Sequence, residues 1–399
     1  HNRKAFYMQA KQRFTNVTLV TPFGEINQDL LVEDELIVDI VDRDTPLSDE
    51  FQIFDGQDNY IFPGMIDVLQ HGFLNYLYGH AEENCTVDNA KLLPGVGVTG
   101  FLPATPCLPP EQTHQLLNNL SNDIDKSNEG ARILGIHSEG PCFALPGAHN
   151  PKNLRNPSLE LAEELIDATH GKLKAVTIAP EMEGSEVFIK RLKKDNVSIH
   201  LGHSGANPKD VPMFADWGVD AVTHMYDALP TYPADDTGVH VLSLTDALIA
   251  EPRIALGLIC DGIHVHPQLV ELLSHLPSDR VFLETDSVKG SGSPVPIKFE
   301  FYPGRWCTVE KGKASTYDGL LAGSSLTSIE GLQNYLKYSK KTISQVSIAA
   351  SLVPARVIGL DDKMGSIEKN KLADFILLRK KNLEIAETFI AGKSVYKSE

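Results

Sequence analysis

Four residues of this sequence carry the side chains that metal-dependent hydrolysis needs. Glu139, His203 and His224 lie at the ends of the β-rich apolar runs ILGIHSEG, SIHLGHS and AVTHMY, and Asp286 lies at the end of VFLETDS. A carboxylate and two imidazoles can hold a divalent cation and leave one coordination position for water. A nearby aspartate can accept and return the proton of that water. We therefore predict that the first three residues bind a metal and that Asp286 is catalytic.

The middle of the chain contains the elements that must position these side chains. Eight short apolar runs alternate there with stretches of helical periodicity, such as residues 157–171 and 184–196. Apolar strands that alternate with helices indicate a parallel sheet covered on both faces. Eight such units favour an α/β fold, a (β/α)₈ TIM-like barrel, whose catalytic groups follow the carboxyl ends of its strands. An open doubly wound sheet is the rival, but no glycine-rich phosphate loop follows the first strand. The runs are MIDVLQ, GVTGFLPAT, RILGIHSEG, KAVTIAPE, SIHLGHS, AVTHMY, IALGLICDG and VFLETDS.

Both ends of the chain have a different pattern. Residues 1–62 and 355–399 consist of short alternating runs separated by turn residues, which indicates β-strands. Each end alone is too small to bury a core. We predict one small β-sandwich domain built from both termini, with the barrel over residues 63–354.

The composition limits the compartment and the partners. The formal charge of −17 argues against nucleic acid or an anionic membrane as a partner. The five cysteines form no CxxC pair and their number is odd, which argues against a disulfide framework. The first residues also lack an apolar signal-peptide core, so we expect a cytoplasmic protein. No apolar run is long enough to span a bilayer.

Several further residues are candidates for the wall of the site. His264 in CDGIHVHP follows the seventh strand and can bind substrate or polarise a carbonyl oxygen. His149 in GAHNP follows Glu139 on a loop, and His71 in DVLQHGF is either a pocket wall or a metal neighbour. Cys142 lies close to Glu139 in the sequence and joins the substrate-binding candidates rather than the nucleophiles. For any one histidine, a structural role after a strand is the commoner explanation.

An ordered set of motifs resembles one enzyme family, the N-acetylglucosamine-6-phosphate deacetylases of the amidohydrolase superfamily, over nearly the whole chain. The motifs are PGMID, GVTGFLPAT, HSEGP, GAHNP, TIAPE, GHSGA, THMYDAL, CDGIHVHP, ETD, LAGSSLT and VPARVIGLDDKMGSIEKNKLADFILL.

The resemblance implies a barrel with a sandwich made from both termini, an N-acetylated sugar as the small-molecule substrate, and a homodimer. It also implies that Glu139, His203 and His224 are the metal ligands, that Asp286 is the acid and base, and that His264 lies near the scissile amide. Zinc is favoured over iron or manganese as the metal.

Two departures from the family pattern matter. Many superfamily members carry His-x-His after the first strand, whereas this chain has Leu69-Gln70-His71, so we predict one metal ion rather than two. The family usually has Asn-Ala and a downstream arginine, which bind the phosphate. Here Asp227 and Ala228 stand at that position, and LPTYPADDTGVH supplies no cation. Either Lys289 or Arg305 binds the phosphate, or the substrate is not phosphorylated.

Two alternative functions remain open from the sequence. The first is a deacylase of an unphosphorylated N-acetyl sugar or of an N-acyl amino acid, which the acidic stretch after His224 favours. The second is a barrel that has lost catalysis and serves in binding, which the replacements Leu69 and Asp227 allow.

Overall fold

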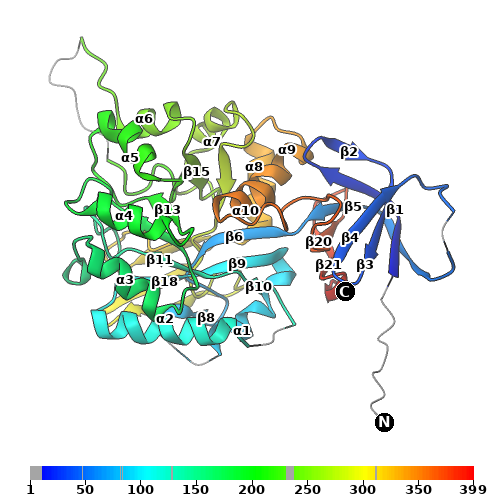
Figure 1. Cartoon of the computed structure of the whole chain (residues 1–399), viewed down its shortest axis with the longest axis horizontal. Helices are drawn as coiled ribbons and strands as arrows, with labels where there is room; N and C mark the ends of the chain where they lie inside the picture. The colour runs from blue at the N-terminus through cyan, green and yellow to red at the C-terminus, as the bar shows by residue number, and fades with distance from the viewer. Residues whose placement is uncertain are drawn as a thin grey trace.

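The computed structural model describes residues 11–46, 48–80, 82, 84–126, 129–230, 238–310 and 312–399. Residues 1–10, at the start of the predicted sandwich, and Asp235 and Asp236, the two aspartates of the stretch LPTYPADDTGVH, lie outside these ranges. A helix-covered body occupies one side of Figure 1, and strands from both ends of the chain form a smaller unit on the other.

The body contains the predicted parallel barrel. All eight apolar runs form strands, and each is paired in parallel with the next along the chain, from β6 to β16. Within the described chain their bounds are β6 (Met65–Gln70), β9 (Val98–Thr105), β11 (Ile136–Glu139), β12 (Leu173–Ile178), β13 (Ser198–Leu201), β14 (Ala221–Val222), β15 (Ala255–Leu258) and β16 (Val281–Leu283), and the short β10 (Arg132–Ile133) precedes β11.

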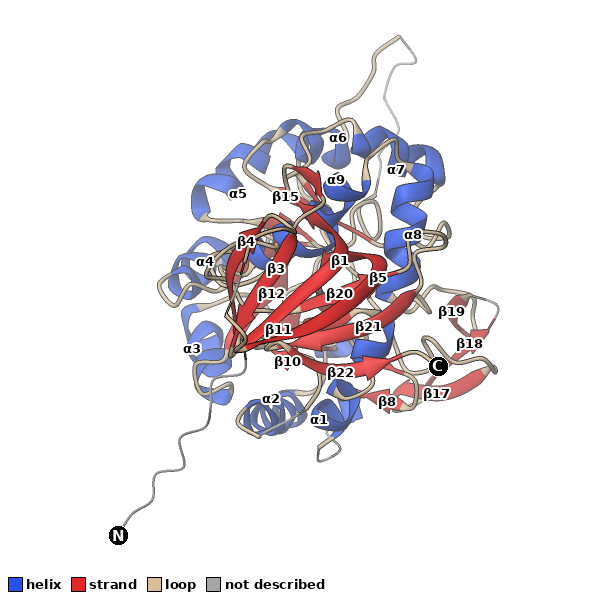
Figure 2. Cartoon of the chain, turned by 90° about the vertical axis from the view of Figure 1, so that its right-hand side faces the viewer, coloured by secondary structure: helices blue, strands red, loops and turns tan. Residues whose placement is uncertain are grey.

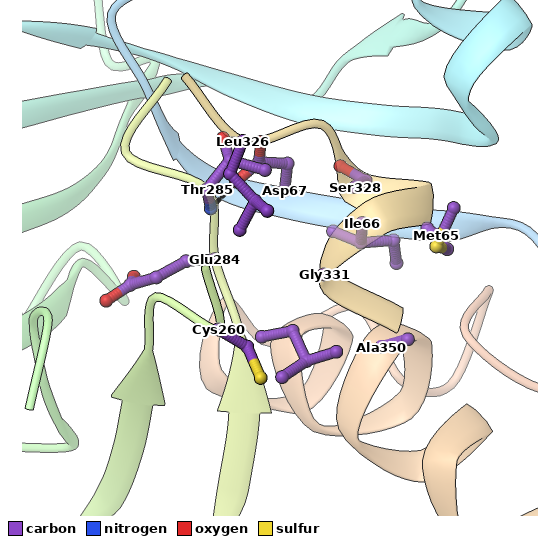
Figure 3. Close-up of a pocket in the computed structure, with 11 residues that line it drawn as sticks. Met65, Ile66, Asp67, Cys260, Glu284, Thr285, Leu326, Ser328, Gly331 and Ala350 are labelled. Carbon is purple, nitrogen blue, oxygen red and sulfur yellow. Dashed lines mark hydrogen bonds between the residues drawn. The ribbon is translucent and has the colours of Figure 1, made fainter. Parts of the chain in front are cut away.

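Contacts between the first and last strands close the barrel. The backbone N–H of Asp286 donates to the carbonyl of Leu69 (2.9 Å), and Gln70 forms a parallel bridge with Ser287. Asp67 adds a side-chain link, because its two oxygens accept from the hydroxyl and the backbone N–H of Thr285 at 2.5 and 3.2 Å. Figure 3 shows Asp67 beside Thr285 at the edge of a narrow void of about 10 Å³.

Helices cover the outside of the barrel where the apolar periodicity predicts them. The stretch 157–171 contains α3, which begins after Ser158, whose hydroxyl accepts the N–H of Leu161 at 3.1 Å as an N-cap. Leu165 of α3 and Phe188 of α4 are buried in the core between helices and sheet. No helix in the described ranges is both long and apolar enough to cross a membrane. The helices are α1 (Cys85–Ala90), α2 (Pro110–Ile124), α3 (Leu159–Ala168), α4 (Ser185–Lys193), α5 (Val211–Trp217), α6 (Leu244–Ala250), α7 (Pro267–Ser274), α8 (Ser328–Tyr338), α9 (Ile343–Ser347) and α10 (Val353–Val357).

The two ends of the chain share one sheet, which confirms a β-structure built from both termini. Strand β5 pairs with β1 on one side and with β20 on the other, so that it joins the two ends (Figure 2). Phe14, Phe375 and Phe389 form the centre of a separate core under this sheet. The strands are β1 (Lys11–Thr21), β2 (Gly24–Ile26), β3 (Asp29–Glu33), β4 (Leu36–Val41), β5 (Phe51–Pro63), β20 (Phe375–Leu378), β21 (Ile385–Ile390) and β22 (Lys393–Lys397).

A small antiparallel sheet after the last barrel strand was not predicted. It consists of β17 (Ile297–Tyr302), β18 (Arg305–Glu310) and β19 (Lys313–Thr316), and it packs on Leu77 and Val288 through its buried face. The short pair β7 (Gly72–Phe73) and β8 (Tyr76–Leu77) lies between β6 and α1.

Candidate metal centre and active site

The structure brings the four predicted residues together at one end of the barrel. Glu139 is the last residue of β11, while His203, His224 and Asp286 follow β13, β14 and β16 within three residues. Because the carboxyl ends of parallel strands meet at the same mouth, these side chains face a common cavity of about 300 Å³. The cavity is lined by His71, Glu139, Gly147, Ala148, His149, His203, His224, Asp227, Ala228, Asp286, Phe301, Gly319, Leu320, Leu321 and Gly323.

Glu139 is the centre of the cluster, because four imidazoles direct their Nε2 atoms at its carboxylate. Oε2 lies 2.9 Å from His71 and 3.1 Å from His149. Oε1 lies 3.2 Å from His224 and 3.4 Å from His203. Burial would raise the pKa of Glu139, but the surrounding histidines outweigh it and hold that pKa well below its usual range. The carboxylate is therefore ionised.

The ring of His203 is fixed on three sides. Its Nδ1–H donates to the carbonyl of Leu145 at 2.9 Å, and Phe143 stacks on the ring with centroids 4.1 Å apart. A Cβ at Gly147 would come within 2.9 Å of His203 Cε1, so the glycine leaves room for the ring. The bond to Leu145 fixes the orientation of the ring and keeps Nε2, the atom that would bind a metal, directed at Glu139.

His71 and His149 join the cluster from the two sides of Glu139. His71 lies between Glu139 and Asp286, with its Nε2 3.4 Å from Asp286 Oδ1. Burial alone would lower the pKa of His71, yet the two carboxylates raise it. The Nδ1 of His149 instead accepts the backbone N–H of Cys107 at 3.3 Å, and burial lowers the pKa of this histidine.

His224 occupies a strained backbone position. Its φ is 34°, in the left-handed region that non-glycine residues rarely adopt, and its N–H donates to Glu284 Oε1 at 2.6 Å. Burial would lower the pKa of His224, but Glu139 and Asp227 raise it to about 10. Burial also raises the pKa of Glu284 to about 8. In Figure 3 the Glu284 carboxyl points away from Asp67 and Thr285.

Asp286 has the environment of a proton-transfer group. Its φ is 49°, so its backbone also adopts the left-handed conformation. Burial, followed by the neighbouring charge of Glu139, raises the pKa of Asp286 to about 7. An acid and base works best when its pKa lies near the working pH.

His264 stands next to the cluster and is held by Asp261. Its Nδ1 lies 2.7 Å from Asp261 Oδ2, and its Nε2 is buried without a partner in the described part of the chain. Burial would lower the pKa of His264, but Asp261, Asp227 and Asp286 raise it. The contact with Asp261 therefore leaves the Nε2 atom of His264 for a ligand.

Of the predicted substrate-binding residues, Asp227 and Ala228 line the cavity with His71 and His149, but Cys142 and His264 are not among the lining residues. Cys142 is 1% exposed, and burial raises the pKa of its thiol to about 12. The thiol is thus protonated and packed in the core, outside the cavity lining, where the structure gives it no contact with a substrate. Phe301, by contrast, was missed although it lines the cavity and contacts His71 and His149. The alternation IKFEFY is a strand signal that would have found it.

The donor set fits a divalent cation. Buried imidazole nitrogens and carboxylate oxygens are the ligands that zinc and similar first-row cations prefer. Two groups have ligand atoms that all lie within 4.8 Å of one another, Glu139 with His149 and His203, and His71 with Glu139 and Asp286. The possible ligands therefore include His71 and His149 in addition to the predicted Glu139, His203 and His224. His224 belongs to neither of these two groups, but its Nε2 lies 3.2 Å from Glu139 Oε1.

A barrel with such a cluster at its mouth defines the class of metal-dependent hydrolases, and comparisons with known proteins specify the family. Residues 110–395 match the model of the amidohydrolase family. The chain belongs to this family and is a metal-dependent enzyme that hydrolyses an amide bond.

Relatives and solved structures are similar over most of the chain. An N-acetylgalactosamine-6-phosphate deacetylase of Escherichia coli O157:H7 is 32% identical over 74% of this chain and 77% of its own length. An N-acetylglucosamine-6-phosphate deacetylase of Danio rerio is 30% identical over 86% of each chain. The crystal structure of the Thermotoga maritima N-acetylglucosamine-6-phosphate deacetylase superposes with a TM-score of 0.84, at 27% identity over 97% of this chain and 100% of its own.

Proposed function

We infer that this enzyme removes the acetyl group from an N-acetylated amino sugar, an N-acetylhexosamine 6-phosphate or a close relative of it. The observation that carries this function is the position of Asp286 beside the Glu139 and histidine cluster at the cavity, with a pKa of about 7. The names of the relatives supply the substrate class. A cavity of about 300 Å³ has room for a monosaccharide.

The metal is held by Glu139, His203 and His224 in this proposal, with His71 and His149 beside them. When bound, the cation supplies Lewis acidity and lowers the pKa of water. Zinc suits the nitrogen and oxygen donors, and we expect one ion because Leu69 cannot act as a ligand. Elemental analysis of protein purified without added metal would identify the ion, and sedimentation would test the expected homodimer.

The chain's own residues carry the proton transfers. Asp286 accepts a proton from the attacking water and later donates it to the nitrogen of the leaving amine, so that the C–N bond breaks and acetate and a free amino sugar form. His264 donates its Nε2–H to the carbonyl oxygen as negative charge develops there. The contact between His264 and Asp261 at 2.7 Å holds the ring in the orientation for this donation.

Acetate release from a panel of N-acetylated sugars, each with and without a 6-phosphate, tests the function. We expect the metal-loaded enzyme to release one acetate per amino group formed with at least one sugar of the panel. Acetate from none of the sugars, in a preparation with full metal content, would contradict the proposal. The variant Asp286→Asn is the matched control, since its side chain keeps the shape but cannot take up the proton.

A further inference from the structure

One wall of the cavity carries a carboxylate that the proposed chemistry does not use. Asp227 lies three residues after His224, and its side chain is 40% exposed at the cavity. Its Oδ1 accepts the backbone N–H of the next residue, Ala228, at 2.9 Å. The backbone N–H of Ala228, which could otherwise donate to an anion, is therefore already bonded to the carboxylate of Asp227. This side of the cavity presents hydrogen-bond acceptors.

The neighbouring sequence offers no lysine or arginine to offset that charge; the basic group that faces it is the His224 ring, whose Nδ1 lies 4.0 Å from Asp227 Oδ2. Among the described residues that line the cavity, none is lysine or arginine. The sequence contains neither residue between Lys209 and Arg253, a stretch that includes all the residues after His224 up to α6. Arg253 is itself paired with Asp216 and Glu251 at 2.6 and 2.7 Å.

The two cations that the sequence suggested as phosphate-binding residues are not part of the cavity wall. Arg305 on β18 forms an ion pair with Asp318 at 2.9 Å. Neither Lys289 nor Arg305 belongs to the cavity lining.

This distribution of charge separates two kinds of sugar. A phosphate dianion is recognised by cations and N–H donors, and a facing carboxylate repels it. A sugar hydroxyl, in contrast, donates to a carboxylate. We propose that Asp227 is a specificity residue that accepts a hydrogen bond from a hydroxyl of an unphosphorylated N-acetylated amino sugar and excludes the 6-phosphate. This proposal rests on the deacetylase function proposed above and selects, among the sugars considered there, the unphosphorylated relative over the 6-phosphate.

The test compares kcat/KM for N-acetylglucosamine and for its 6-phosphate, with acetate release as the readout and the metal-loaded enzyme as the sample. The wild-type enzyme should prefer the unphosphorylated sugar by about tenfold or more. Asp227→Asn removes the charge at constant shape and should reduce that preference by about tenfold, through a lower KM for the phosphorylated sugar. Asp125→Asn, which removes an exposed carboxylate paired with Lys172, should leave the ratio of the two substrates unchanged.

Each outcome bears on the proposal. A wild-type preference for the phosphorylated sugar overturns it, and so does an unchanged ratio in Asp227→Asn, while both results leave the deacetylase function intact. The enzyme can also release acetate from neither of these sugars but from another N-acetylated sugar of the wider panel. If that sugar is phosphorylated, the assignment of Asp227 alone is overturned. If it is neutral, the assignment is supported. Acetate from no sugar at all contradicts the deacetylase function and this inference together.

Discussion

Two groups of buried histidines lie in the same barrel, one at its mouth and one inside it, and they differ in their partners. The outer group surrounds Glu139 at the mouth, and the rings of His203 and His224 are 5.0 Å apart. The inner group consists of His137 on β11 and His200 on β13, whose rings are also 5.0 Å apart. Both groups are almost fully buried, so burial and spacing do not distinguish them.

The difference lies in the partners. His137 contacts the carbonyl of Val68 at 2.6 Å and the hydroxyl of Thr177 at 2.8 Å, and burial lowers its pKa to about 4. His224 contacts a carboxylate, and its pKa rises to about 10 although burial opposes this rise. A buried imidazole with neutral partners is therefore a structural element, whereas a buried carboxylate can raise the pKa of its histidine neighbour, as it does for His71 and His224 but not for His149.

The largest expected effect concerns proton transfer at the mouth. Asp286→Asn should lower kcat by about 10³-fold, because an amide cannot accept the proton of water at neutral pH. The metal content should stay as in the wild type, since this variant keeps Glu139 and the histidines. Steady-state kinetics together with elemental analysis would check both parts. Turnover near the wild-type rate would remove Asp286 from its role.

A matched pair of histidine variants compares the two groups directly. His203→Ala should weaken metal affinity by about 100-fold or more, because it removes a side chain whose Nε2 faces Glu139. His200→Asn, on the same strand but inside the barrel, should bind metal as the wild type does. Competition with a chelator of known affinity measures both variants, and circular dichroism confirms that each is folded. Equal metal loss in the two variants would contradict the distinction between the groups.

The smallest expected effect is a pH dependence of stability that the inner group causes. Burial holds the pKa of His200 in the folded state well below 6.5, the ordinary value for histidine. Below pH 6.5 the unfolded chain therefore binds a proton that the folded chain does not, and the free energy of unfolding falls by up to about 1.4 kcal/mol per pH unit. Urea unfolding between pH 7 and pH 5 should show a shallower loss in His200→Asn. An identical slope would show that His200 does not contribute.

The barrel and its metal centre follow from local patterns in the sequence. Apolar runs of strand length that alternate with helical periodicity specify a parallel sheet, and parallel strands place their carboxyl ends together. Glu139, His203, His224 and Asp286 could be assigned to one site for this reason, although β14 is only two residues long in the structure. The small sheet of β17 to β19 was missed because the barrel pattern ends before it.

The sequence by itself determined which residue types follow which strands, because that information is local and periodic. Only the tertiary structure decided which partner each buried group meets. It placed His71 and His149 on Glu139, covered the Ala228 N–H with Asp227, and buried Cys142 away from the cavity. These contacts depend on which distant segments meet and on how each side chain is oriented, and the periodicity of the sequence encodes neither. Since partner rather than residue type sets the pKa and the ligand capacity of a buried group, the chemistry of this site is defined at the level of the fold.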